Sequence, residues 1–163
     1  AFTTTFLEEG DEAILFQPMF LWYPHLENIG VDVKFTSLVF DDQTKTYKVN
    51  FKELREQISP RTKLITIINP NNPNGKCFTL EELLEIRQIC LENPHIMILS
   101  DEVYTLFTYD GIKHVPIACI PDMFERTLTL NSQGKEFSCT GWRVGTLTGP
   151  DYLIEPISEF LRF

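Results

Sequence analysis

Residues 64–75 read Leu-Ile-Thr-Ile-Ile-Asn-Pro-Asn-Asn-Pro-Asn-Gly, an apolar run followed at once by a turn-forming run. Leu64–Ile68 is apolar at both odd and even positions, which is typical of a central strand covered on both faces. Residues 69–75 are all asparagine, proline or glycine, which favour turns and do not continue a strand. The stretch therefore predicts a buried strand that ends in a polar loop.

Outward from this strand, short apolar runs alternate with segments of helical periodicity. This alternation predicts an α/β domain with a mostly parallel sheet flanked by helices. The best helix is expected at Thr79–Leu91, which opens with Thr79 and Glu82 as a capping box. The residues expected to share its apolar face are Leu80, Leu83, Leu84, Cys90 and Leu91. Further strands are expected at Ala13–Phe16, Ile96–Leu99 and Thr127–Leu130, a weaker one at Val31–Phe35, and a short helix at Phe51–Ile58.

The composition fits one ordinary globular domain. The chain has 163 residues, of which 43% are hydrophobic and 23% charged, and its formal net charge is −9. A nucleic-acid binder normally has a basic face, so this acidic balance argues against nucleic acid as a partner. No apolar run approaches the roughly 20 residues that cross a bilayer, so no membrane segment is expected. The four cysteines and three histidines are scattered, which predicts reduced thiols, a cytoplasmic location and no metal site.

Both ends of the chain have the character of cuts through a longer protein. Residues 1–10 form an amphipathic stretch that we expect to be a helix closed by Gly10, with nothing leading into it. Residues 157–163 have apolar side chains at helical spacing and no stop signal. We therefore expect residues 1–163 to be a single partial domain.

Polar side chains follow three of the expected strands, at the point where each strand ends. These polar segments are residues 69–75, 100–102 and 131–135. Because the carboxyl ends of parallel strands meet at one edge of a sheet, their amides, carboxylate, hydroxyl and lysine should converge there. Such a set suits a polar, phosphorylated ligand. The site is not a P-loop, since Pro70 and Cys77 stand where that motif needs a glycine and a hydroxyl residue.

Three motifs make the sequence resemble a known family. They are residues 69–75 (Asn-Pro-Asn-Asn-Pro-Asn-Gly), 100–104 (Ser-Asp-Glu-Val-Tyr) and 132–145 (Ser-Gln-Gly-Lys-Glu-Phe-Ser-Cys-Thr-Gly-Trp-Arg-Val-Gly). In order and spacing they resemble the class I aminotransferases of fold type I, which depend on pyridoxal 5′-phosphate. Residues 123–142, with Pro18-Met19-Phe20 and Tyr23, look most like the branch of kynurenine aminotransferase, glutamine transaminase K and methionine aminotransferase. The resemblance covers essentially the whole chain and departs at Asn74, where threonine or leucine is usual.

The resemblance implies that Lys135 holds pyridoxal 5′-phosphate as a Schiff base. A partly desolvated lysine can act as a neutral amine nucleophile, and its freed amine can then move a proton between substrate and cofactor. Asp101 would pair with the protonated pyridine nitrogen, while Tyr104 and Asn72 would hydrogen-bond the phenolic oxygen of the ring. The alternatives are a surface lysine at 135, a cap for a helix beginning at Glu102, a core tyrosine at 104 and a plain turn residue at 72.

The resemblance also implies how the rest of the cofactor is held. Ser132 and Arg143 would bind the phosphate, the first through its hydroxyl donor and the second through the paired N–H donors of its charged guanidinium. Phe20 would stack on the pyridine ring and exclude water, and Tyr23 could line the substrate side. The alternatives are a strand-end turn residue at 132, a surface charge at 143 and a core phenylalanine at 20.

The function implied is transfer of an amino group between an amino acid and a 2-oxo acid, by a homodimer. Two alternatives stay open, a pyridoxal-phosphate-dependent C–S β-lyase on the same scaffold and a catalytically silent, truncated partner subunit. The family's N-terminal phosphate turn and its C-terminal small domain, with the arginine that grips the substrate carboxylate, are expected to be absent from residues 1–163. We therefore expect a partial cofactor-binding large domain that is inactive by itself.

Overall fold

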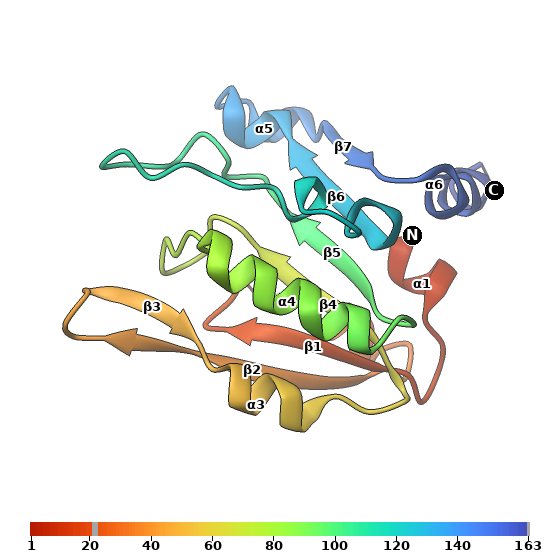
Figure 1. The fold of residues 1–163 in the computed structure, drawn as a ribbon. Coiled ribbons are helices and arrows are strands. Elements are labelled where there is room, and N and C mark those ends of the chain that lie inside the picture. The colour runs from red at the N-terminus through yellow and green to blue at the C-terminus, as the bar shows by residue number, and fades with distance from the viewer. Residues whose placement is uncertain (21–22, 163) are drawn as a thin grey trace.

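The computed structural model describes residues 1–20 and 23–162. Within them, one sheet has the strand order β3-β2-β1-β4-β5-β6-β7 (Figure 1). The strands are β1 (Glu12–Gln17), β2 (Asp32–Asp41), β3 (Thr46–Val49), β4 (Thr62–Ile68), β5 (Met97–Asp101), β6 (Thr127–Ser132) and β7 (Gly145–Thr148). The helices are α1 (Phe2–Phe6), α2 (Pro24–Glu27), α3 (Phe51–Gln57), α4 (Leu80–Glu92), α5 (Gln133–Glu136) and α6 (Asp151–Phe160), with 3-10 turns at Ile117–Cys119, Phe124–Arg126 and Thr140–Trp142.

The sheet is mostly parallel, which confirms the predicted fold class. Strands β2, β1, β4, β5 and β6 run parallel, whereas β3 and β7 pair antiparallel with β2 and β6 at the two edges. The predicted central strands are present with ends shifted by one or two residues, but the strand expected at Val31–Phe35 continues as β2 to Asp41. Strands β3 and β7 were not predicted, because most of their residues face solvent and they contain no continuous apolar run.

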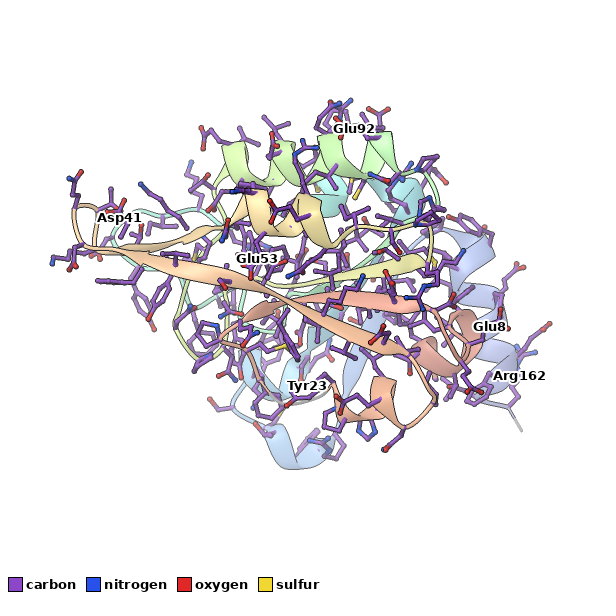
Figure 2. All side chains as sticks on the ribbon, turned by 90° about the horizontal axis from the view of Figure 1, so that it is seen from below. Glu8, Tyr23, Asp41, Glu53, Glu92 and Arg162 are labelled. Atoms are coloured by element: carbon purple, nitrogen blue, oxygen red, sulfur yellow. The ribbon has the colours of Figure 1, made fainter. Side chains whose placement is uncertain are left out.

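Helices cover both faces of the sheet. Helices α3 and α4 lie on one face and α1, α2 and α6 on the other (Figure 1). Figure 2 shows Glu92 of α4 and Tyr23 beside α2 on opposite sides of the sheet. Along β1, Ile14 packs into the core under α3 and α4, whereas Ala13 and Leu15 pack into the core on the other face. This two-sided burial is the reason why the central strands are apolar at nearly every position.

The predicted capping box of α4 is present, but the buried face of the helix differs from the prediction. Thr79 Oγ1 accepts from the Glu82 N–H at 3.2 Å, and Glu82 Oε2 accepts from the Thr79 N–H at 2.9 Å. The buried side chains of α4 are Leu83, Ile86, Ile89 and Cys90. Leu80, Leu84 and Leu91 are instead 46%, 42% and 38% exposed. Apolar residues occupy so much of this helix that periodicity alone did not identify the stripe that faces the sheet.

The first helix is shorter than the expected stretch, and Gly10 does not cap it. Helix α1 ends at Phe6, and its C-cap residue Leu7 is extended. Gly10 has a φ of +90° in the turn that leads into β1. Three consecutive threonines give α1 a low intrinsic helix propensity, which accounts for its single turn. In the part of the chain that the structure describes, none of the helices has the length and hydropathy needed to cross a membrane.

Candidate functional site

Strands β4, β5 and β6 end side by side in the middle of the sheet. Ile68, the last residue of β4, is paired with Asp101, the last residue of β5, and Asp101 is paired with Leu130 of β6. The polar segments that follow these strands therefore leave the same edge of the sheet, as the sequence predicts.

The turns after β4 and β5 contact each other through Asn72 and Tyr104. Asn72 Nδ2 donates a hydrogen bond to the Tyr104 hydroxyl oxygen at 3.2 Å. The turn that carries Asn72 is itself anchored, because Asn71 Nδ2 donates to the Pro18 carbonyl at 2.8 Å and Asn69 Oδ1 accepts from a backbone N–H. Asn72 is thus more than a turn residue, since its side chain reaches the next turn along the edge.

Lys135 lies on α5, a single helical turn directly after β6. Its Nζ is 5.9 Å from the centroid of the Tyr104 ring. The Gly134 carbonyl accepts from the Cys139 N–H at 3.0 Å and from Thr140 Oγ1 at 3.1 Å, which folds the following turn back onto α5. A Cβ at position 134 would lie 3.0 Å from Thr140 Cα, so this close approach requires the glycine that precedes the lysine.

Ser132, Lys135 and Arg143 line one hollow of about 200 Å³, together with Thr140, Val144 and Gly145. Arg143 has a φ of +57°, and this left-handed residue ends the turn that brings β7 back antiparallel to β6. Neither Lys135 nor Arg143 forms an ion pair with any residue that the structure describes. A hollow with a hydroxyl and two unmatched cations suits an anion such as a phosphate.

Asp101 is half-buried, and among the described residues its carboxylate accepts one hydrogen bond, from the Val103 N–H at 3.3 Å. Burial raises the pKa of this carboxyl, the Val103 N–H lowers it, and the neighbouring Glu102 carboxylate raises it further. No helix begins at Glu102, since residues 103–106 form a turn, so the alternative of a helix cap is wrong. A desolvated carboxylate with an oxygen to spare suits a cationic hydrogen-bond donor.

Phe20 and Tyr23 are not brought into this cluster. Phe20 is 60% exposed, so the alternative of a core phenylalanine is wrong, and its stacking role stays a prediction. Tyr23 packs edge-on against Phe35 of β2, with ring centroids 5.1 Å apart, and belongs to the core on the α2 side of the sheet.

Sequence reasoning missed three contacts around the turn after β5. The Glu102 side chain, only 4% exposed, accepts from Ser100 Oγ at 2.9 Å and pairs with His114 Nε2 at 2.9 Å. Glu136 accepts a hydrogen bond from Thr105 Oγ1 at 3.3 Å. No sequence pattern predicts these contacts, because they depend on the path of the chain around this turn, which only the fold determines.

A larger cavity of about 750 Å³ lies between the β2–β3 hairpin and the start of α4, and none of the predicted site residues lines it. Lys76 in its wall is buried, and its Nζ lies 2.8 Å from Glu82 Oε2 and 2.6 Å from the Tyr47 carbonyl. Because this charge is already matched, the hollow at Lys135 is the better candidate for an anion. Among the described residues, no group of His, Cys, Asp and Glu is arranged to hold a metal ion.

Comparison with known proteins gives consistent relatives. The model of the family "Aminotransferase class I and II" matches residues 1–163. Kynurenine–oxoglutarate transaminase 1 of Mus musculus is 39% identical over 157 residues, which cover 91% of this chain and 37% of that protein. Aromatic-amino-acid aminotransferase 2 of Thermococcus litoralis is 36% identical over 159 residues, which cover 98% of this chain and 40% of the relative.

Solved structures agree with these sequence relatives. N-succinyldiaminopimelate aminotransferase from Mycobacterium tuberculosis matches with a TM-score of 0.90 at 31% identity, over 96% of this chain and 40% of that one. The chain thus spans about two fifths of the length of the proteins that it matches.

Proposed function

Because the chain belongs to the class I and II aminotransferase family, we propose that it carries the cofactor site of an enzyme that uses pyridoxal 5′-phosphate to move an amino group between an amino acid and a 2-oxo acid. The observation that carries the proposal is the meeting of Ser132, Lys135 and Arg143 in one hollow at the carboxyl edge of the sheet. The relatives reported above are aminotransferases by name, which favours amino transfer over C–S bond cleavage.

The chemistry of the residues present fits this cofactor. Arg143 offers a guanidinium and Ser132 a hydroxyl to a phosphate, and neither cation of the hollow is neutralised by a described acidic residue. Asp101 offers a desolvated carboxylate to a ring N–H, and its burial disfavours a charge that has no cationic partner. When bound, pyridoxal phosphate supplies an electron-withdrawing ring that stabilises negative charge on the substrate α-carbon.

Lys135 is assigned the reacting amine. Its Nζ would hold the cofactor covalently before substrate arrives and would then take the proton from the substrate α-carbon. Tyr104, whose ring lies 5.9 Å from that amine, accepts a hydrogen bond from Asn72, so its own O–H proton is available to a second acceptor such as the ring oxygen. Phe20 is proposed to cover the ring. It follows Pro18 by two residues, and the Pro18 carbonyl is anchored by a hydrogen bond from Asn71 Nδ2.

We also propose a homodimer in a reducing compartment such as the cytoplasm. Exposed aromatic side chains next to the hollow support a partner surface there, since Phe137 is 69% and Trp142 79% exposed. All four cysteines are free thiols, which supports a reducing environment.

Borohydride trapping tests the proposal directly. The chain is incubated with pyridoxal phosphate, reduced and digested, and the modified lysine is identified by peptide mass. Lys135 is expected to be modified first and at the lowest cofactor concentration. Label on other lysines with none on Lys135 would refute the assignment.

Two comparisons show whether the hollow selects the phosphate. Arg143→Ala should lower the labelling of Lys135 by pyridoxal phosphate about tenfold, the effect of losing roughly 1.4 kcal/mol of charge-assisted hydrogen bonding. Labelling by pyridoxal, which lacks the phosphate, should be unchanged in the same variant. Lys52→Ala, which removes an 86% exposed lysine of α3, is the matched control and should change neither rate.

A further inference from the structure

One hydrogen bond joins the two turns that carry Tyr104 and Lys135. Thr105 Oγ1 donates to Glu136 Oε1 at 3.3 Å, and both residues are half-buried. Thr105 directly follows Tyr104 in the chain, and Glu136 directly follows Lys135. Among the described residues, no other hydrogen bond or ion pair connects the loop after β5 with α5 or with the turn that follows α5. This contact therefore couples the two turns directly.

The turns at this edge of the sheet are linked in series. Asn72, in the turn after β4, donates to the Tyr104 hydroxyl at 3.2 Å, and the next residue, Thr105, donates to Glu136 of α5. The segments that follow β4, β5 and β6 are thus joined by two side-chain hydrogen bonds, one on each side of Tyr104. Loss of either bond would release one segment from its neighbour while the strands beneath remain paired.

Helix α5 has few fixed points of its own. It is a single turn, Ser132 provides no side-chain cap, and its close packing is at Gly134 against Thr140. The Lys135 amine lies 5.9 Å from the centroid of the Tyr104 ring, at the outer limit of about 6 Å for a cation–π contact. Because ordering a lysine side chain costs conformational entropy, so long a contact needs support from the backbone that carries it.

We propose that Thr105 and Glu136 are positioning residues that hold the Lys135 amine beside the Tyr104 ring. Adjacent residues of a helix point in different directions, so the turn that places Lys135 in the wall of the hollow directs Glu136 elsewhere, toward Thr105. Glu136 does not line the hollow, and its carboxylate therefore does not compete there with an anion. The inference rests on the proposed function only in the role given to Lys135.

The test measures the contact between Lys135 and Tyr104 in the chain without cofactor. With ¹³C-labelled lysine and tyrosine, a nuclear Overhauser effect between the Lys135 side chain and the Tyr104 ring is expected in the unaltered chain. Lys135→Arg and Tyr104→Phe identify the two signals. Thr105→Val removes the donor at nearly constant shape, and Glu136→Ala removes the acceptor, so each should weaken the effect severalfold.

Conservative variants separate this hydrogen bond from a general effect on the fold. Thr105→Ser keeps a hydroxyl donor and Glu136→Gln keeps an amide oxygen as acceptor, so both should retain the contact at its original strength. Thr105→Val combined with Glu136→Ala should lose no more than either substitution alone, because both remove the same bond. The matched control is Thr44→Val, which removes a hydroxyl that contacts Thr46 at 3.0 Å on the β2–β3 hairpin and should leave the contact unchanged.

Reductive labelling of Lys135 by pyridoxal is the second readout, and it needs no phosphate contact. It should fall about fivefold in Thr105→Val and in Glu136→Ala, the change expected from one lost hydrogen bond, and recover in Thr105→Ser and Glu136→Gln. A contact unchanged in the valine and alanine variants, or lost in the glutamine variant as well, would overturn the proposal. A contact that changes as expected in a chain whose Lys135 is never labelled would support this inference and contradict the proposed function.

Discussion

Replacing Glu12 by glutamine should destabilise the fold at the amino ends of the parallel strands, away from the carboxyl ends that form the candidate site. Glu12 opens β1, and its side chain is 1% exposed. Its carboxylate lies 2.8 Å from Lys34 Nζ and 2.7 Å from Arg61 Nη2, and it accepts from Ser59 Oγ at 2.6 Å and Thr62 Oγ1 at 2.9 Å. Glutamine keeps the volume but removes the charge and one acceptor oxygen, so the two cations lose their shared anion.

The magnitude follows from the ionisation of this carboxyl. Burial alone would raise the pKa of Glu12, but hydrogen bonds from Lys34, Ser59 and Thr62 outweigh it and lower the pKa from 4.5 to about 2. That difference corresponds to roughly 3 kcal/mol of stability at pH 7. Lys34 is 28% exposed, so solvent screens part of its contribution, and we expect Glu12→Gln to lower the free energy of unfolding by about 2 kcal/mol.

The sign of the pH dependence is set by the depressed pKa. A carboxyl whose folded pKa lies below its unfolded value stabilises the fold above the unfolded pKa, and this contribution is lost as pH falls toward the folded value of about 2. Urea unfolding of both proteins at pH 7 and at pH 4 should therefore show a larger difference at pH 7.

The matched control is Glu56→Gln on α3, where the carboxylate is 66% exposed and 3.9 Å from Lys52. This substitution should lower the free energy of unfolding by less than about 0.5 kcal/mol. The reasoning would be refuted if Glu12→Gln were as stable as this control at pH 7. It would also be refuted if the difference in unfolding free energy between Glu12→Gln and the unaltered chain were as large at pH 4 as at pH 7.

Three further predictions concern the site and its surroundings. In a protein extended to the length of the relatives, Asp101→Asn removes a charge at nearly constant volume, so bound cofactor should persist while turnover falls by about 10²-fold. Tyr104→Phe in the same protein should give a milder loss of turnover, because only one hydrogen bond is removed; equal losses, measured by steady-state kinetics beside cofactor absorbance, would contradict this. Gly134→Ala should lower the free energy of unfolding, measured in urea, by about 1–2 kcal/mol, because the new Cβ would lie 3.0 Å from backbone. Gly141→Ala, with nothing within 4 Å of its Cβ, should be nearly neutral, and equal effects of the two substitutions would show that the turn at Gly134 can adjust to a side chain. Burial raises the pKa of Cys90 to about 12, so iodoacetamide at pH 8 should leave it unmodified in the folded chain and modify it in urea, as peptide mass would show; rapid labelling of the native thiol would contradict its burial.

The central sheet could be predicted because its residues leave few alternatives. Leu64, Ile65 and Ile67 are fully buried in β4, and only a strand covered on both faces accommodates such a run in so short a span. The edge strands β3 and β7 could not be predicted, since half-solvated strands take ordinary polar residues and depend on their neighbours for pairing. The buried stripe of α4 was only partly predicted, because the sheet selects one of several apolar faces.

The sequence by itself determined the central strands of this protein and the candidate site residues that lie at or just after their ends, Asp101 and Tyr104 at β5 and Lys135 after β6. Only the tertiary structure decided which side chains meet: Asn72 with the Tyr104 hydroxyl, and His114 with Glu102. The physical reason is that strand and turn propensities act over a few residues, whereas these contacts depend on strand register and on the path of loops. Neither of these is settled until the whole sheet has packed.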